Sequence, residues 1–372
     1  MSLSSMLYNI PLYQPVGTPP DESEIIVLCP QEDIKHILTT FPNHKIRLII
    51  SNKLQEQKFL SNNTKTIPID ADFTKILDFP QCYIIIFCYK INLGILNWFY
   101  LQLQQIKIGH VFICSPIPIT VAEYISYSYY FSPEFFDKYR NELENVYNLF
   151  SDDESKMIFA SRIKSIITGN AGYIKQSGHN QYFHPLALPS AGDTILDGGV
   201  SENTDIVRQF SQFIGDEGHV YAFEPEPACY YQASDKIVNI KNITLLPFGI
   251  WDKCEKISFI SAGSSSHAVD GDTNDDCVTC HMTTIDAIAA QYNIKKIDMI
   301  KLDVEGSEEK ALLGGIKTIV KHRPKLLISI YHNLNDIFEL PLFVNKLDLN
   351  YKFYLGHYTP LLQECVLYAL PG

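Results

Sequence analysis

Short apolar runs alternate with amphipathic segments through the second half of the chain, and this alternation predicts strands joined by helices. The runs Thr194–Leu196 and Val220–Phe223 have the length and composition of buried strands. Between them, Asp205–Phe213 carries apolar residues at helical spacing, and two glycines follow it. The pattern is typical of a βαβ unit, in which two parallel strands are connected by a helix.

The same alternation continues to the end of the chain. An amphipathic pattern over Glu308–Val320 predicts one helix. The last two apolar runs, Lys352–Leu355 and Glu364–Tyr368, predict an antiparallel pair that closes the sheet. Further strands are expected at Ile243–Pro247, Lys256–Ser261, Val278–Thr284, Asp298–Leu302 and Lys325–Ile330.

The first third of the chain has its own alternating pattern. The whole chain has 372 residues, which is more than one hydrophobic core usually fills, so we expect more than one domain. We predict a doubly wound, Rossmann-like α/β domain over residues 1–118, a helical connector over 119–170 and a second α/β domain over 171–372. No glycine follows the first strand of this domain, so the sequence does not support nucleotide binding there. We expect the domain to orient the substrate, to dock another protein or to form an oligomer. Its strands are predicted at Glu24–Leu28, Ile46–Ile50, Thr66–Ile69, Tyr83–Cys88 and His110–Cys114.

The turn after Thr194–Leu196 suggests what the second domain binds. It begins Asp197-Gly198-Gly199, and the strand Val220–Phe223 ends in Glu224, an acid placed to meet a ribose diol. A diphosphate-binding turn would have a third glycine, but residues 197–204 contain only two glycines. They also contain two acids and no Lys or Arg. A cationic nucleoside without phosphate, such as S-adenosylmethionine, fits this turn better than a dinucleotide.

The composition of the chain excludes some classes of binding partner. The apolar fraction of 46% and charged fraction of 19% are those of a folded protein, and a net charge of −12 argues against nucleic acid or an anionic membrane as partner. No signal peptide or membrane span is recognised, so we predict a cytoplasmic protein whose nine cysteines are free thiols. The string Cys277-Val278-Thr279-Cys280-His281 is compatible with haem, zinc or redox chemistry, but a structural pair on a β-ribbon is the simpler interpretation.

Two further strand ends carry groups that can do chemistry. Asp303 follows the strand Asp298–Leu302, and Glu305 and Glu308 come soon after it. Acids at this position often cap a helix, which is a sufficient role for Glu308. His332 follows the strand Lys325–Ile330, and an imidazole is well suited to accept a hydroxyl proton near neutral pH. Asp303 and His332 are therefore the candidate catalytic residues, and Asp303, Glu305 and His332 could alternatively hold a divalent metal.

Five motifs, taken in order, resemble the FkbM-type branch of class I S-adenosylmethionine-dependent methyltransferases. The resemblance covers the C-terminal half and implies a Rossmann-like methyltransferase domain with an antiparallel edge, whose usual activity is O-methylation of sugars or natural products. The motifs are Asp197-Gly198-Gly199, Ala222-Phe223-Glu224-Pro225, Thr284-Ile285-Asp286, Ile300 through Glu308, and Ile330-Tyr331-His332.

The resemblance also implies roles for individual residues. Asp197 and Gly199 would contact the methionine part of the cofactor, Glu224 its ribose, and residues 248–252 its adenine. Asn203 departs from the family, which often has glycine there. The cofactor-binding set implied in this way is Asp197, Gly198, Gly199, Asn203, Glu224, Pro225, Gly249, Trp251 and Asp303.

Two other functions stay open from the sequence. Two α/β domains facing one cleft also suit a nucleotide-sugar or NAD-dependent enzyme, although the phosphate-binding glycines are missing. A non-catalytic protein that retains the methyltransferase fold is the other alternative, favoured by Asn203. The partner we expect is a small-molecule or glycan acceptor, and a homo-oligomer is compatible with the sequence.

Overall fold

The fold is described from a computed structural model of the 372-residue chain. The residues that the structure describes are 2–10, 22–29, 37, 41–51, 59–60, 64–68, 82–87, 111–114, 132, 134–168, 173–260, 267–268, 277–359 and 362–372. The predicted residues Ile69, Cys88 and His110, and the helices expected between the N-terminal strands, lie outside this set.

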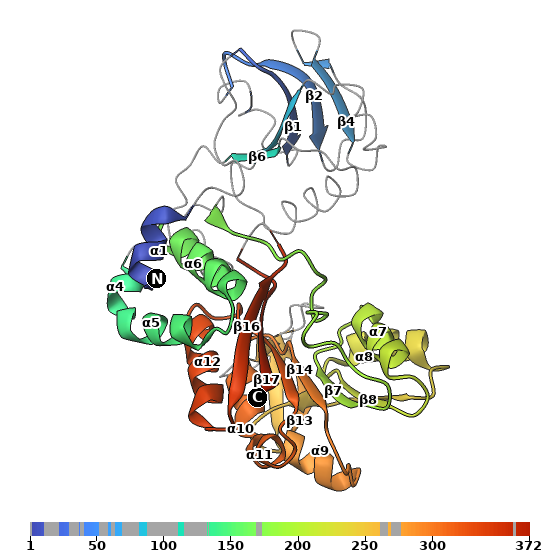
Figure 1. Ribbon diagram of the computed structural model, residues 1–372. Coiled ribbons are helices and arrows are strands. Elements are labelled where there is room, and N and C mark those ends of the chain that lie inside the picture. The colour runs from blue at the N-terminus through green and yellow to red at the C-terminus, as the bar shows by residue number, and fades with distance from the viewer. Residues whose placement is uncertain are drawn as a thin grey trace.

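One large mixed sheet organises the C-terminal half (Figure 1). All its neighbouring strands pair in parallel except β17, which runs antiparallel to both β15 and β16. The predicted closing antiparallel pair is therefore confirmed. In spatial order the strands are β16 (Tyr351–His357), β17 (Cys365–Pro371), β15 (Lys325–Ser329), β14 (Met299–Leu302), β7 (Thr194–Gly198), β8 (His219–Phe223) and β9 (Ile243–Leu246).

Helices pack on this sheet through the apolar faces that the sequence predicts. In α7 (Asp205–Ile214), Val207, Phe210 and Ile214 are buried at helical spacing, and Gly215 ends the helix with a φ of +66°. The other helices after β7 are α8 (Pro227–Ile237), α9 (Ile285–Gln291), α10 (Glu308–Leu313), α11 (Ile316–His322) and α12 (Asp336–Lys346).

A small second sheet lies between β9 and β14 in the chain. The predicted strands Lys256–Ser261 and Val278–Thr284 correspond to β11 and β13, which pair antiparallel. Along β13, Cys280 is buried against Trp251 and Met282 whereas His281 is exposed, and burial raises the pKa of the Cys280 thiol to about 12. This environment favours the structural interpretation of the cysteine string. The strands are β10 (Gly249–Ile250), β13 (Cys277–Thr283), β11 (Lys256–Ile260) and β12 (His267–Ala268).

The N-terminal third contains a separate sheet, which is parallel apart from the short edge strand β3. Each predicted strand of this region overlaps an observed one. Whether the sheet is doubly wound stays a prediction, because that depends on its connecting segments. The spatial order is β3 (Phe59–Leu60), β4 (Thr64–Pro68), β2 (Lys45–Ser51), β1 (Glu24–Cys29), β5 (Tyr83–Phe87) and β6 (Val111–Cys114).

The first helix of the chain packs on the helices that precede the large sheet. In Figure 1, α1 (Leu3–Asn9) lies beside α5 (Arg140–Leu149) and α6 (Asp153–Thr168), and the Glu144 carboxylate accepts the backbone N–H groups of Leu3 and Ser4. The short α4 (Phe135–Lys138) joins the same group. The far N-terminus thus shares a hydrophobic cluster with the C-terminal sheet.

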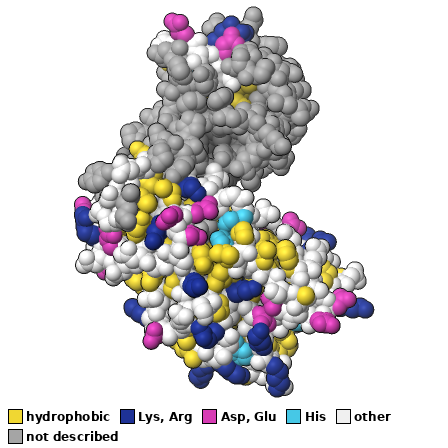
Figure 2. Space-filling model, viewed as in Figure 1, with side chains coloured by type: hydrophobic (Ala, Val, Ile, Leu, Met, Phe, Trp, Pro, Cys, Tyr) yellow, Lys and Arg dark blue, Asp and Glu magenta, His cyan; other side chains and the backbone are white. Residues whose placement is uncertain are grey.

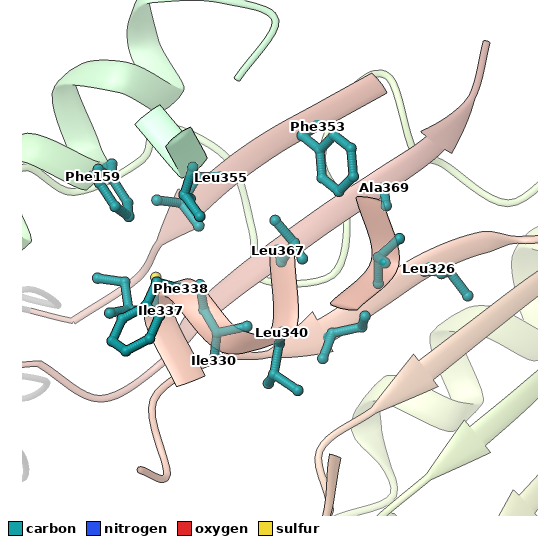
Figure 3. Packing of buried hydrophobic residues seen from close by; sticks show 14 of the residues in the cluster. Phe159, Leu326, Ile330, Ile337, Phe338, Leu340, Phe353, Leu355, Leu367 and Ala369 are labelled. Carbon is teal, nitrogen blue, oxygen red and sulfur yellow. The ribbon is translucent and has the colours of Figure 1, made fainter. Parts of the chain in front are cut away.

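That cluster is the main core of the described structure. Figure 3 shows side chains of β15, β16 and β17 meeting those of α12, with Phe159 of α6 on the other side of Leu355. The β17 strand is buried along Cys365–Leu370, so both of its faces are covered. This packing holds β17 inside the core of the C-terminal half.

One predicted element is wrong. The sequence predicts a single helix over Glu308–Val320, but α10 ends at Leu313 and α11 begins at Ile316. Gly314 and Gly315 separate them because a Cβ at Gly314 would collide with the backbone carbonyl of Trp251, and the Gly314 carbonyl accepts the N–H of Asp286 at 3.0 Å. Close backbone approach overrides the helical periodicity here.

The visible surface carries both signs of charge. In Figure 2, Lys and Arg side chains gather on the lower part of the face shown, with hydrophobic side chains between them. Basic groups are thus gathered on this part of the visible face although the net charge of the chain is −12. Among the helices that the structure describes, none is both long and apolar enough to span a bilayer.

The contact at Gly314 generates a stability prediction. Gly314→Ala should lower the free energy of unfolding by about 1–3 kcal/mol, because the new methyl group forces the Trp251 backbone to move. Gly178→Ala is the matched control, since an added Cβ there meets nothing within 4 Å, and it should change stability by less than about 0.5 kcal/mol. Urea unfolding of both variants checks this, and equal midpoints would contradict the packing argument.

Candidate active site

The site lies where the strand order of the large sheet reverses. The chain goes from β7 to β8 and β9 on one side, and it later returns to β14 and β15 on the other side of β7. Loops that follow parallel strands at such a reversal diverge and leave room for a ligand. The predicted residues Asp197, Glu224, Asp303 and His332 all lie at this edge, as the sequence indicates.

The glycines after β7 let two loops approach each other. Gly199 has a φ of +80°, and a Cβ there would collide with the backbone carbonyl of Asp303. Two non-glycine residues of these loops, Ser201 and Glu305, also have positive φ values of 53° and 52°. Residues are held in this conformation only where their surroundings impose it, and such positions cluster at functional sites.

The buried side chain of Lys301 binds the glycine loop that follows β7. Register pairs Lys301 of β14 with Asp197 of β7, and Lys301 Nζ lies 3.1 Å from Asp197 Oδ1. The same ammonium donates to the carbonyls of Gly198 at 3.1 Å and Gly199 at 2.6 Å. Burial alone would lower the pKa of Lys301, but Asp197 and Asp303 raise it, so the side chain is a cation. This role of Lys301 was not predicted from the sequence, although a lysine inside an apolar strand indicates a buried charge that needs a partner.

Glu224 closes the other side of the loop. Its Oε2 accepts the backbone N–H of Ser201 at 2.8 Å, and its Oε1 accepts that of Glu226 at 2.9 Å. Burial raises the pKa of Glu224 to about 7, against the opposing effect of these two hydrogen bonds. Each oxygen keeps a lone pair that can accept a hydroxyl.

Asp303 is held by two tyrosines that were not predicted as site residues. Tyr182 Oη donates to its Oδ2 at 2.8 Å, and Tyr331 Oη donates to its Oδ1 at 3.1 Å. Burial would raise the pKa of Asp303, but Lys301, His332 and hydrogen bonds with Tyr182 and Ser329 hold it below its ordinary value. Tyr182 comes from an irregular segment more than a hundred residues upstream, so no sequence motif connects it to Asp303.

His332 is surrounded by carboxylates. Its Nδ1 lies 2.9 Å from Glu308 Oε1, and its Nε2 lies 3.6 Å from Asp303 Oδ1 and 3.5 Å from Glu305 Oε2. Burial would lower the pKa of His332, but these three acids together raise it to about 10. Without another cation, the imidazole is therefore protonated at neutral pH and cannot accept a proton.

One more acid reaches this group from the loop before β17. Glu364 lies 3.5 Å from Tyr331 Oη and accepts a hydrogen bond from Gln181. Burial and the nearby Asp303 raise the pKa of Glu364 to about 7. It was predicted only as a strand residue, because its neighbours in space are distant in the sequence.

Comparisons with known proteins identify the C-terminal part of the chain. Residues 192–355 match the family model described as the methyltransferase FkbM domain. These residues are an FkbM methyltransferase domain. The chain thus carries a domain of an S-adenosylmethionine-dependent methyltransferase family, and the predicted resemblance is confirmed.

Two relatives of the FkbM domain are informative. The crystal structure named methyltransferase FkbM, from Methylobacillus flagellatus KT, superimposes with a TM-score of 0.58 at 15% identity over 99% of each chain, which shows a shared fold. A curated protein of Sinorhizobium fredii (strain NBRC 101917 / NGR234), named 2-O-methyltransferase NoeI, is 23% identical over 39% of this chain. The match spans 65% of that relative's length.

The remaining predicted cofactor residues of the FkbM domain lie in different environments. Asn203 is exposed, and its Oδ1 accepts the N–H of Asp205 at 3.1 Å, so its side chain supports the start of α7. Pro225 and Gly249 are neighbours, since a Cβ added at Gly249 would lie 3.4 Å from Pro225. Trp251 is buried, with Lys310 Nζ 3.9 Å from its ring centroid, which favours a packing role. Direct contacts of these four residues with the cofactor stay predictions.

The ion pair under the glycine loop gives a prediction for the FkbM domain. Lys301→Met should destabilise the protein by about 3–5 kcal/mol, because it leaves the Asp197 carboxylate buried without a partner. It should also weaken binding of S-adenosylhomocysteine, because the loop carbonyls lose their donor. Adding Asp197→Asn to Lys301→Met should recover part of the stability. Thermal or urea unfolding of the wild type, both single variants and the double variant measures the coupling, and additive effects would disprove it.

Proposed function

We propose that this protein transfers the methyl group of S-adenosylmethionine to a hydroxyl group of a sugar, glycan or natural-product acceptor. The observation that carries the proposal is the arrangement at the strand-order reversal. Asp197, the glycine loop and Glu224 form one side of this edge, and Asp303 with His332 forms the other. The FkbM family supports the reaction class.

The cofactor would lie along the glycine loop. We expect the ribose hydroxyls to donate to the free lone pairs of Glu224, while the methionine part lies near Asp197 and Gly199. Asp197 and Glu224 are acidic, and residues 197–204 contain no Lys or Arg that could bind a phosphate. This charge distribution favours the cationic sulfonium over a dinucleotide. Lys301 is occupied by Asp197 and by two loop carbonyls.

Methyl transfer is an in-line displacement, so the acceptor oxygen must be positioned opposite the sulfur. The C–O bond forms as the C–S bond breaks, S-adenosylhomocysteine leaves, and the hydroxyl loses its proton. We assign proton acceptance to the Asp303 carboxylate, which Tyr182 and Tyr331 orient. His332 lies 3.6 Å from Asp303 and is expected to hold the acceptor oxygen against it.

The acceptor class comes from the relatives and from the site. The Sinorhizobium fredii relative is named a 2-O-methyltransferase, so the nucleophile we expect is an oxygen. Tyr182, Tyr331 and the surrounding carboxylates offer many hydrogen-bonding groups in a small region, which suits a polyhydroxylated acceptor such as a sugar.

The raised pKa of Glu224 predicts pH-dependent cofactor binding. Ribose hydroxyls donate to the ionised carboxylate, so affinity for S-adenosylhomocysteine should fall as the pH decreases through about 7, by up to about tenfold per pH unit. Glu224→Gln should bind weakly at every pH from 6 to 8. Calorimetric titrations of both proteins at several pH values test this, and an equal slope for wild type and Glu224→Gln would exclude Glu224 as its source.

The activity itself is tested with labelled cofactor and a panel of glycosides and oligosaccharides. We expect transfer of one methyl group to a hydroxyl of at least one of them, with mass spectrometry locating the modified oxygen. His332→Gln should bind S-adenosylhomocysteine within about threefold of wild type and transfer methyl about 10²-fold more slowly, because the acceptor oxygen is no longer held against Asp303. NAD and UDP should not raise the melting temperature. Stabilisation by either nucleotide, with none by S-adenosylhomocysteine, would refute the proposed function.

A further inference from the structure

The carboxylates around His332 form a group with the composition of a metal site. One oxygen of Asp303, one of Glu308 and a ring nitrogen of His332 all lie within 4.8 Å of one another. A fourth group, Glu305, brings its Oε2 to 3.5 Å from His332 Nε2. These residues come from the loop after β14, the start of α10 and the loop after β15, so the fold of the domain places them together.

The imidazole is oriented in the way that metal-binding histidines usually are. Glu308 is 1% exposed, and its Oε1 lies 2.9 Å from Nδ1 while it also accepts the backbone N–H of Val304 at 2.8 Å. A carboxylate fixed against one ring nitrogen sets the ring orientation and leaves the other nitrogen as the ligand atom. Glu308 thus turns Nε2 toward Asp303 and Glu305.

Nε2 itself is an independent indication of a ligand. His332 is 9% exposed, and neither ring nitrogen makes a well-aligned hydrogen bond among the residues that the structure describes, although Nδ1 lies 2.9 Å from Glu308 Oε1. The neighbours of Nε2 are carboxylate oxygens at 3.5 and 3.6 Å. Ligand atoms at right angles around a divalent cation are about 3 Å apart, because each is about 2.1–2.2 Å from the metal. A movement of about half an ångström would bring each of these two carboxylate oxygens to that distance from Nε2.

We propose that His332 Nε2, Asp303 and Glu305 bind one divalent cation, with Glu308 holding the imidazole from outside. Two carboxylates and one imidazole suit a cation of intermediate hardness, and Mn²⁺ fits this donor set best. Asp303 and Glu305 are 22% and 35% exposed, so coordination positions facing solvent stay open for an acceptor.

The role of the cation in catalysis rests on the proposed O-methylation, whereas the binding site does not. A hydroxyl coordinated to a divalent cation has a lowered pKa and is a better nucleophile. Two adjacent hydroxyls could chelate the same cation, so acceptors with a vicinal diol would be preferred over those with an isolated alcohol.

The decisive experiment is a titration of the full chain with Mn²⁺, followed by electron paramagnetic resonance and calorimetry. Wild type should bind one Mn²⁺ per chain. Glu305→Gln and His332→Gln should each weaken binding by at least about tenfold, and Glu308→Gln by about 10–100-fold through loss of ring orientation. Glu339→Gln is the matched control, because Glu339 is an exposed acid of α12 outside this group, and it should bind Mn²⁺ like wild type.

The alternative is a protonated imidazole that pairs with the same carboxylates and needs no metal. It would be indicated by the absence of Mn²⁺ binding at millimolar concentration, or by equal binding to wild type, Glu305→Gln and His332→Gln, and either result overturns the proposal. Circular dichroism and S-adenosylhomocysteine binding show that each variant is folded. If wild type binds S-adenosylhomocysteine but not Mn²⁺, only the cation site is wrong, whereas the reverse result refutes the proposed function alone.

Discussion

The site depends on the single ammonium group of Lys301 beneath the glycine loop. Its three oxygen partners come from Asp197, Gly198 and Gly199, which are consecutive residues at the end of β7. A lysine taken out of water without partners would be strongly destabilising, so burial is possible only because these oxygens replace its hydration. The lysine therefore fixes the loop to β14 and, through the close contact of Gly199 with Asp303, sets the spacing between the two halves of the site.

That spacing brings opposite electrostatic environments close together. On the β7 side, one buried cation neutralises Asp197 and leaves Glu224 in contact with backbone N–H groups. On the β14 side, Asp303, Glu305 and Glu308 surround one imidazole. Three ionised acids near one neutral ring would repel each other, and burial already raises the pKa of Glu305 to about 7. A positive charge at the centre of the group, either a proton on His332 or a metal cation, relieves this repulsion.

Much of the fold and the edge that carries the site could be predicted from the sequence. Parallel strands have one direction, so acids and histidines that follow several strands must meet at the same edge. This reasoning brought Asp197, Glu224, Asp303 and His332 together correctly. It could not identify Lys301, whose role depends on register with a strand about a hundred residues away. Nor could it identify Tyr182, which reaches Asp303 from an irregular segment, or Glu364, which lies against Tyr331 from the loop before β17.

The charge on His332 is a second property that could not be predicted from the sequence. An imidazole after a strand is reasonably predicted to be a base, since its ordinary pKa is near neutrality. The turn at Glu305 and Gly306, with φ values of 52° and 89°, reverses the chain so that Glu305 and Glu308 both face the ring. Because the pKa follows from that three-dimensional arrangement and not from residue type, the histidine changes from proton acceptor to cation or ligand. Asp303, fixed by two tyrosines, is then the group better placed to receive the proton of an acceptor hydroxyl.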